Sequence, residues 1–336
     1  MFSATTDPLI REVQGRYGVG PLFAEAYLAY WHKGFARPFN NLAEILSLPP
    51  PQSYWFEYAI TTNTRGQWLV QQCAKYLPKG ARRFLDIGCG YGGVLTAFSK
   101  LGLDVTGIDL DEELLPLAQA NCRDHGLGDC THQISILEAG LPERLGRFDV
   151  ITLISVIEHV ADVSGTLAHI VDLLNPGGVA ILIIPNYQSL SVVAHDPHYD
   201  LFAISLLDPP QALAYYQALF QGEYGVGEYY PLADYLLRLE QLGCKTLLEC
   251  AWRAAIKLHG RALPDSLIIS KSQRNFDCNI RPKIPAALAS EIDLRYSTYV
   301  KRLRSELLRR SLSPFNPDSY QQTYLAVTWT VIATKK

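Results

Sequence analysis

The sequence predicts an α/β protein built on a doubly wound parallel sheet. From residue 82 onward, short apolar segments of strand length alternate with segments of helix length. The first apolar segment leads directly into a glycine-rich turn, RFLDIGCGYGG at 83–93. This alternation is typical of a parallel sheet with helices on both faces, whose ligands bind beyond the carboxyl ends of the strands.

The elements of residues 82–186 follow from the apolar runs and from the residues that end them. The last of three expected helices ends where proline and glycine occur together, at Asn175-Pro176-Gly177-Gly178. The expected strands are 82–88, 103–110, 131–138, 148–155 and 178–186, and the expected helices are 92–102, 112–126 and 161–178.

Further regions surround this core. The alternation stops after Asn186, resumes with a helix at 231–243 and a strand at 244–252, and ends in a β-pattern at 323–336. The expected parts are an N-terminal helical cap at 1–80, a core at 81–186, a substrate-site insertion at 187–228, a core continuation at 229–252, a helical insertion at 253–319 and a last core strand at 320–336.

Charge and cysteine usage exclude several function classes. The chain has 30 Lys and Arg against 33 Asp and Glu, so no overall field draws it to nucleic acid or to an anionic membrane. Its seven cysteines contain no C-x-x-C pair, which argues against a disulfide framework and against structural zinc. The sequence shows no sign of a signal peptide, and its apolar runs are too short to cross a bilayer. We expect a cytoplasmic protein that binds neither nucleic acid nor membrane.

The turn GCGYGG fits two kinds of ligand. Gly88 to Gly93 satisfies the dinucleotide fingerprint G-x-G-x-x-G, whereas counting from Asp86 gives D-x-G-x-G-x-G, as in S-adenosylmethionine enzymes. The glycines are compatible with both ligands, because side chains at Gly88 and Gly90 would block the approach of either one to the backbone. Asp86 discriminates, since a carboxylate there repels a pyrophosphate and attracts the α-ammonium group of a methionine moiety. This argues for S-adenosylmethionine over NAD.

Taken in order, FLDIGCGYGG, VTGIDLDEELLPLA, FDVITLISVIEHV and LLNPGGVAILIIPN resemble the class I S-adenosylmethionine-dependent methyltransferases. The E-H-V after the fourth strand and the P-N after the fifth are similar to the ubiquinone-biosynthesis type of O-methyltransferase. The likeness covers 82–186, with a looser match at 229–252 and 320–334. It implies a Rossmann-like, doubly wound, seven-stranded and mostly parallel sheet whose last strand is antiparallel, with an N-terminal helical cap and two insertions.

The resemblance also implies which residues hold the methionine end of S-adenosylmethionine. In the family pattern, Gly88, Gly90 and Gly92 line the methionine and ribose, and Asp86 lies near the amino group. Ser155, at the end of the fourth strand, lies beside the sulfonium.

At the other end of the cofactor, Asp109 would hold the ribose hydroxyls and Leu110 would pack on the adenine. Glu138 matches the acid that meets the adenine amino group in this family. From the residues alone, Asp109 is neutral between the two cofactors, because an acid there can accept ribose hydroxyls in either. A helix cap or a surface acid is the remaining alternative for Asp86 and Asp109.

Two histidine-containing stretches are candidates for removing a proton from an acceptor. His159 follows the fourth strand, and its alternative role with Glu158 is to cap the next helix. AHDPHYD at 194–200 places His195 and His198 in the insertion where the substrate is expected.

The same stretch supplies Asp196 and Tyr199 as expected substrate-facing residues, unless Asp196-Pro197 merely initiates a turn. His195, Asp196 and His198 are spaced unlike any strong metal-ligand motif, so no metal site is expected. Tyr58 lies one helix before the first strand and is expected to contact the substrate.

Two further motifs are assigned structural roles. Asp208-Pro209-Pro210-Gln211 resembles the motif of amine methyltransferases, but it lies in an insertion and predicts a turn followed by a helix start. The basic segment at 290–310 lies on a helix with an apolar stripe of Leu288, Ile292, Tyr296, Tyr299, Leu303 and Leu307, so its charges are expected to form the solvated face.

The sequence therefore predicts an S-adenosylmethionine-dependent methyltransferase that acts on a small molecule, at oxygen, such as a secondary metabolite or a glycan or lipid precursor. The alternatives are an N-methyltransferase acting on a small amine or a peptide terminus, and a catalytically inactive, cofactor-binding partner subunit. A homodimer is compatible with the sequence.

Overall fold

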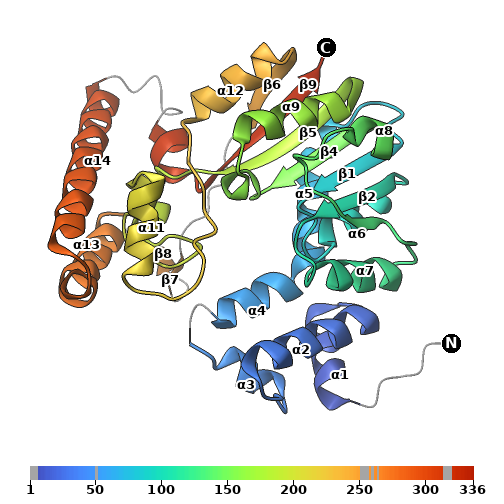
Figure 1. Ribbon diagram of the computed structural model, residues 1–336, viewed down its shortest axis with the longest axis horizontal. Helices are drawn as coiled ribbons and strands as arrows, with labels where there is room; N and C mark the ends of the chain where they lie inside the picture. The colour runs from blue at the N-terminus through green and yellow to red at the C-terminus, as the bar shows by residue number, and fades with distance from the viewer. Residues whose placement is uncertain (1–6, 50–51, 250–256, 259–260, 263–264, 313–319) are drawn as a thin grey trace.

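The computed structural model describes residues 7–49, 52–249, 257–258, 261–262, 265–312 and 320–336. Its centre is a seven-stranded sheet in the order β3-β2-β1-β4-β5-β9-β6 (Figure 1). The strands are β1 (Arg83–Ile87), β2 (Asp104–Asp109), β3 (Thr131–Gln133), β4 (Phe148–Ile154), β5 (Leu174–Pro185), β6 (Cys244–Glu249) and β9 (Thr328–Lys335). Neighbouring strands are parallel, except that β9 is antiparallel to both β5 and β6. The predicted doubly wound sheet with an antiparallel last strand is confirmed.

Helices cover both faces of this sheet. One face packs against α5, α6 and α7 through an apolar cluster that includes Phe84, Leu95 and Phe98. The other packs against α8, α9 and α12 through a cluster that includes Leu85, Leu167 and Leu239. These helices are α5 (Thr62–Cys73), α6 (Gly93–Ser99), α7 (Leu115–Asp124), α8 (Leu141–Leu145), α9 (Val163–Leu173) and α12 (Leu232–Gln241).

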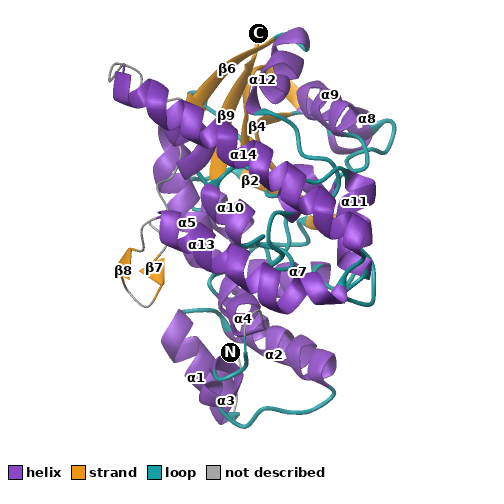
Figure 2. Ribbon diagram, turned by 90° about the vertical axis from the view of Figure 1, so that its left-hand side faces the viewer, coloured by secondary structure: helices purple, strands orange, loops and turns teal. Residues whose placement is uncertain are grey.

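The N-terminal helices form a lobe below the sheet (Figures 1 and 2). They are α1 (Pro8–Tyr17), α2 (Pro21–Phe35), α3 (Leu42–Leu46) and α4 (Gln52–Ile60). The lobe is joined to the core at the start of α2, where the carboxylate of Asp124 in α7 accepts from the backbone N–H of Leu22 and of Phe23, at 3.1 and 2.8 Å. The predicted N-terminal helical cap is confirmed. The carboxylate of Asp124 anchors it to the core by satisfying two backbone N–H groups in the first turn of α2.

The two insertions pack on each other and share one apolar core. Phe202 and Tyr215 of the first insertion lie in the same buried cluster as Phe276, Ile292 and Tyr296 of the second. The helices are α10 (Leu190–Ala194), α11 (Pro209–Gln217), α13 (Asp265–Asn275) and α14 (Ala286–Leu312), and a small hairpin pairs β7 (Lys257–Leu258) with β8 (Arg261–Ala262). The two insertions, between which α12 and β6 lie in the sequence, therefore form a single structural unit.

Short 3-10 and π turns connect these elements. They are η1 (Ala74–Tyr76), η2 (Ile157–His159), η3 (Ile204–Leu206), η4 (Phe276–Ile280), η5 (Arg281–Lys283) and η6 (Gln321–Leu325). Among the described residues, no helix combines the length and apolarity that a bilayer crossing requires.

Three expected boundaries are wrong. The third strand ends at Gln133, because Glu138 folds back to accept from the backbone N–H of Ser135 and closes a turn. The third expected helix ends at Leu173, because Leu174 is already extended and pairs with Phe148. The Asn-Pro-Gly-Gly segment is consequently an irregular first part of β5, and not the end of a helix.

The third boundary concerns the last strand, which begins at Thr328 and not at residue 323. The side-chain amide of Asn186 donates to the carbonyls of Gln322, Thr323 and Ala326, at 3.0, 2.9 and 2.7 Å, and holds residues 321–325 in a π turn. The asparagine of the P-N pattern therefore shapes the start of β9. The last part of the expected strand 244–252, residues 250–252, lies outside the described residues.

The apolar stripe of α14 is only partly buried. Ile292, Tyr296 and Tyr299 are buried, and Lys301 is exposed as expected. Leu307, expected in the stripe, is 43% exposed, because the end of α14 extends past the shared core of the insertions. Arg302, Arg304 and Arg309 are likewise exposed, and the side chain of Arg310 lies outside the described residues.

Helices α5 and α6 approach each other through two glycines, Gly66 and Gly93. A Cβ atom on Gly66 would lie 2.1 Å from the carbonyl oxygen of Gly93, and one on Gly93 would lie 2.3 Å from the carbonyl oxygen of Thr62. Because these are backbone contacts, neither can be relieved by a side-chain rotation.

Gly66→Ala is therefore expected to lower the free energy of unfolding by about 1–3 kcal/mol despite the higher helix propensity of alanine. The matched control is Gly34→Ala in α2, where no atom lies within 4 Å of the added Cβ and alanine is expected to be neutral or stabilising. Urea denaturation followed by circular dichroism measures both, and equal stability of the two variants would contradict the close approach of α5 and α6.

Candidate active site

The glycine turn joins β1 to α6; it is tightly packed at Gly88 and open at Gly90. Gly88, Gly90 and Gly92 all have positive φ, at 71°, 48° and 74°. A Cβ on Gly88 would lie 2.3 Å from Cγ2 of Val156, whereas one on Gly90 would meet no atom within 4 Å. The turn is thus packed against the segment after β4, and it is open at Gly90, where a ligand can approach the backbone.

Asp109 ends β2 beside this opening. Its Oδ2 accepts from the backbone N–H of Gly90 at 2.8 Å, and its Oδ1 accepts from that of Asp111 at 3.0 Å. The next residue, Leu110, is 66% exposed, which is unusual for a leucine beside a strand end. The structure therefore brings the predicted Asp109 and Leu110 to the same edge as the glycine turn.

Asp86 lies inside the protein, below the turn. It is 2% exposed, and its Oδ1 accepts from the hydroxyl of Thr152 at 2.6 Å. Burial raises the pKa of Asp86 to about 8, although the hydrogen bond from Thr152 acts in the opposite direction. An adjacent ammonium group would stabilise the carboxylate form.

A buried amide network, which the sequence does not predict, holds the glycine turn in place. The side chains of Asn63 in α5 and Asn121 in α7 exchange two hydrogen bonds, at 3.0 and 2.9 Å. Asn121 also donates to the carbonyl of Tyr91 at 2.8 Å, and Thr96 donates to Asn63 at 3.0 Å. No local pattern could have identified this network, because its members lie on three different helices and in a turn.

Ser155 and Glu138, both predicted to contact the cofactor, have defined local roles. Ser155 has a φ of 51°, a left-handed conformation that costs a non-glycine residue about 1–3 kcal/mol, and it redirects the chain from β4 into η2. Glu138 is paired with Arg144 at 3.0 Å, in addition to its hydrogen bond with Ser135.

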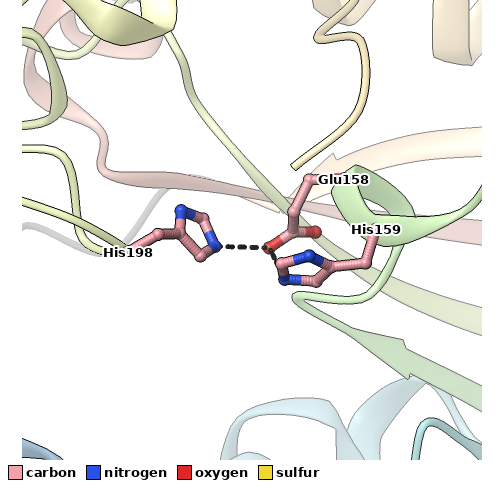
Figure 3. A group of neighbouring side chains, drawn as sticks. All are labelled: Glu158, His159 and His198. Carbon is pink, nitrogen blue, oxygen red and sulfur yellow. Dashed lines mark ion pairs between the residues drawn. The ribbon is translucent and has the colours of Figure 1, made fainter. Parts of the chain in front are cut away.

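Immediately after β4, Glu158 lies between two histidines (Figure 3). The Nε2 of His159 lies 3.8 Å, and the Nε2 of His198 3.9 Å, from the same carboxylate oxygen, Oε1 of Glu158. Glu158 is 1% exposed, and its other oxygen, Oε2, is buried without a hydrogen-bond partner among the described residues. Glu158 and His159 come from η2, whereas His198 comes from the first insertion.

The other nitrogen of each histidine is held from outside the cluster. Nδ1 of His159 lies 2.6 Å from the carbonyl oxygen of Gly225, and Nδ1 of His198 lies 3.4 Å from Oδ1 of Asp196. Asp196 is itself buried and accepts from the backbone N–H of His198 and of Tyr199. Both imidazole rings are therefore fixed with Nε2 directed at Glu158.

The cluster is electrostatically coupled. Burial raises the pKa of Glu158 to about 7 and lowers the pKa of His159. Burial also disfavours protonated His198, but its hydrogen bond to Asp196 and the charges of Asp196 and Glu158 outweigh this effect and raise its pKa. The protonation of each of the three groups therefore depends on the other two.

His195 does not join this cluster, although it was predicted with His198. Its Nδ1 lies 2.7 Å from Oδ1 of Asp200, and its Nε2 lies 2.8 Å from the hydroxyl of Ser272 in α13. Its catalytic role stays a prediction. Tyr58 is 43% exposed on α4, with the guanidinium of Arg65 over its ring at 3.7 Å, and its substrate role also stays a prediction.

Tyrosines surround the cluster. Tyr199 packs against His198 and Tyr224, with ring centroids 6.1 and 5.3 Å apart, and its hydroxyl accepts from the backbone N–H of Gly225. Tyr187 and Tyr229 stack at 5.9 Å, and the hydroxyl of Tyr229 is buried without a partner among the described residues.

The strand order with an antiparallel β9, together with the glycine turn and the acid that ends β2, defines a class I S-adenosylmethionine-dependent methyltransferase fold. The open space at Gly90 and the exposed Leu110 fit this cofactor. The chain belongs to the methyltransferase-domain family, whose sequence profile matches residues 30–249.

Relatives agree with this assignment. The chain is 45% identical over 98 residues to a ubiquinone biosynthesis O-methyltransferase of Methylococcus capsulatus, over 29% of this chain and 40% of that protein. It is 36% identical over 178 residues to the enzyme of the same name from Psychrobacter cryohalolentis, over 52% of this chain and 63% of that protein. The chain thus matches less than two thirds of the length of either relative.

Solved structures of low sequence identity are also similar. A SAM dependent methyltransferase from Archaeoglobus fulgidus has a TM-score of 0.47 and 14% identity, covering 84% of this chain and all of that one.

The buried Asp86 makes stability depend on pH. Folded Asp86 keeps its proton to about pH 8, whereas an unfolded aspartate releases it near pH 4. Between these values the folded state binds more protons, so the free energy of unfolding falls as the pH rises. Asp86→Asn removes this dependence, and the variant should gain on the order of a few kcal/mol relative to the wild type between pH 5 and pH 8.

Urea denaturation at both pH values, in the absence of cofactor, measures this difference. Asp104→Asn, which changes an exposed carboxylate at the start of β2, is the control and should show no such gain. A constant difference between wild type and Asp86→Asn would mean that Asp86 is already ionised at pH 5.

Proposed function

We propose that this protein transfers the methyl group of S-adenosylmethionine to a hydroxyl group of a small molecule. One observation carries the proposal. The glycine turn packs against Val156, two residues before Glu158, so a methyl donor on the turn would lie beside the Glu158–His159–His198 cluster. Donor and proton-accepting groups would then meet at the carboxyl ends of β1 and β4, where such sheets bind ligands.

The proposed cofactor contacts follow the edge of the sheet. The backbone at Gly88, Gly90 and Gly92 would line the methionine and ribose, and Asp86 would attract the ammonium group. Ser155 would lie beside the sulfonium.

At the nucleoside end, Asp109 would accept the ribose hydroxyls with the lone pairs that its bonds to Gly90 and Asp111 leave free. Leu110 would cover the adenine. Glu138 would accept from the adenine amino group while it stays paired with Arg144.

In the proposed reaction, the acceptor oxygen attacks the methyl carbon as the carbon–sulfur bond breaks, and the sulfur keeps the bonding electrons. The proton of the hydroxyl passes to His198 or, through it, to Glu158, with Asp196 orienting the imidazole. His159 would hold the other side of Glu158. Removal of the proton is useful only if the oxygen and the methyl are aligned, which the surrounding tyrosines would ensure.

The tyrosines also support the choice of acceptor. Tyr199, Tyr224, Tyr187 and Tyr229 give the site flat apolar walls, and the unpartnered hydroxyl of Tyr229 offers one hydrogen bond. This favours a small aromatic or otherwise planar alcohol. A cytoplasmic location and a homodimer remain predictions.

Calorimetric titration with S-adenosylmethionine, its demethylated product and NAD is the first test. Binding of the first two without NAD is expected, followed by methyl transfer to members of a panel of phenols, sugars and carboxylates. Transfer only to amines would favour the N-methyltransferase. Cofactor binding with no transfer to any acceptor would favour an inactive partner subunit.

The exposed Leu110 offers a clean test of the adenine contact. Leu110→Ser should leave the free energy of unfolding nearly unchanged, because a side chain that is 66% exposed makes few contacts in the protein. It should weaken S-adenosylmethionine binding roughly 3- to 10-fold, because it removes apolar surface from the adenine. Leu101→Ser, at an exposed leucine after α6, is the matched control, and equal affinities of the two variants would remove Leu110 from the cofactor site.

Replacing the proposed base should separate chemistry from binding. His198→Ala is expected to lower kcat about 10²- to 10⁴-fold while the affinity for S-adenosylmethionine stays within about twofold of wild type. His195→Ala is the comparison, because His195 lies in the same insertion but is bound by Asp200 and Ser272. If His195→Ala lost the activity and His198→Ala kept it, the base would be His195.

A further inference from the structure

We propose that Glu158, His159 and His198 form a binding site for one divalent transition-metal ion of the zinc class, with a coordination position left open for the acceptor oxygen. The binding of the ion is independent of the proposed function, whereas its contact with the acceptor rests on it. The spacing of His195, Asp196 and His198 predicts no metal site, because it does not reveal that His198 meets Glu158 and His159 in the fold.

The three side chains already have the arrangement of a ligand set. One ligand atom from each of them lies within 4.8 Å of the other two, and both Nε2 atoms face Oε1 of Glu158, at 3.8 and 3.9 Å (Figure 3). In a tetrahedral zinc site with bonds of 2.0–2.2 Å, such atoms lie about 3.3–3.6 Å apart. The two distances to Glu158 would have to shorten by about half an ångström and the separation of the two histidine nitrogens, which is at most 4.8 Å, by up to about 1.5 Å; side-chain rotations can supply such movements.

The present contacts leave the buried carboxylate poorly satisfied. Both Nε2 distances exceed those of a hydrogen bond, and Oε2 has no partner among the described residues. A carboxylate that is 1% exposed is costly unless a cation or hydrogen-bond donors compensate it. A divalent cation between the carboxylate and the imidazoles would compensate it fully.

The outer contacts of both histidines are those that metal-binding histidines use. Gly225 accepts through its carbonyl from Nδ1–H of His159, which leaves the lone pair of Nε2 directed at Glu158. The carboxylate of Asp196 lies beside Nδ1 of His198 and has the same effect there. A carboxylate or carbonyl behind a ligating imidazole fixes its tautomer and raises its basicity.

The ligand types indicate the class of ion. Two imidazoles and one carboxylate suit zinc, iron, cobalt, nickel or manganese, whereas calcium and magnesium prefer sites made of oxygen ligands. Three protein ligands leave a tetrahedral ion with a free position, as in catalytic zinc sites. The ring of Tyr199 packs against His198 at the edge of this cluster.

An ion there would bind the hydroxyl oxygen of the acceptor as a Lewis acid and favour loss of its proton to water. The metal-bound oxygen would then attack the methyl carbon, the carbon–sulfur bond would break, and the sulfur would keep the electron pair. In this form of the reaction the histidines hold the ion and do not carry the proton.

The test begins with metal binding, which needs no acceptor. The full chain is stripped with a chelator and titrated by calorimetry with Zn²⁺, Mn²⁺ and Mg²⁺, and Co²⁺ is added as a spectroscopic probe. One equivalent of Zn²⁺ should bind more tightly than Mg²⁺, and Co²⁺ should give the visible absorption of a tetrahedral nitrogen–oxygen site.

Two variants and one control assign the binding to these residues. Glu158→Gln, which keeps the shape of the side chain, and His198→Ala should each weaken Zn²⁺ binding about 100-fold and abolish the Co²⁺ absorption. His195→Ala should change neither, because His195 lies outside the cluster. Circular dichroism confirms that each variant is folded.

Absence of stoichiometric Zn²⁺ binding by the folded wild type would overturn the site, and so would Zn²⁺ binding that Glu158→Gln and His198→Ala leave unchanged. Methyl transfer that is insensitive to removal of the metal would overturn the contact between ion and acceptor. Neither result affects the proposed methyltransferase function, whose failure is detected separately by the titration with S-adenosylmethionine.

Discussion

The turn between β1 and α6 is confined on several sides, and the candidate site depends on that confinement. A Cβ added to Gly88 would clash with Val156 in the segment after β4, and one added to Gly92 would lie 3.0 Å from the carbonyl oxygen of Ala118 in α7. The carbonyl of Tyr91 is held by Asn121, which Asn63 holds in turn. These contacts join the turn to α5, α7 and the segment after β4. Asp109, which binds Gly90, and Glu158, two residues after Val156, are placed relative to each other by this packing.

Much of the fold could be predicted because its strands are buried on both faces. Runs such as 179–184 are continuously apolar, and 150–157 is nearly so; such runs are the strongest signal of a parallel sheet. Two of the three wrong boundaries arose where a side chain overrode the backbone preference. Glu138 closes a turn inside an apparent strand, and Asn186 holds a π turn where the Thr- and Val-rich sequence indicated a strand. Side-chain hydrogen bonds to the backbone leave no periodic pattern in the sequence.

The relative positions of the candidate site residues were predictable only around the glycine turn. Asp86, the glycines and Asp109 lie within one strand–helix–strand unit, whose geometry follows from its sequence. The acceptor side is assembled from three distant segments, at 157–159, 196–199 and 225–229, and the path of the first insertion decides which histidine reaches Glu158. His195 and His198 are equivalent in the sequence, but the turn closed by Asp196 directs them to different partners. The nearly complete burial of Glu158 was likewise hidden, because its neighbours suggested a helix cap.

The shared core of the two insertions has a consequence for any attempt to remodel the candidate site. Phe202 and Tyr215 pack against Phe276 and Tyr296, so each insertion covers apolar surface that the other would otherwise expose to water. His198 and Tyr199, which lie in the candidate site, belong to this unit. Exchanging one insertion alone would leave the apolar surface of the other uncovered. The two insertions therefore have to be exchanged as a pair, although α12 and β6 lie between them in the chain.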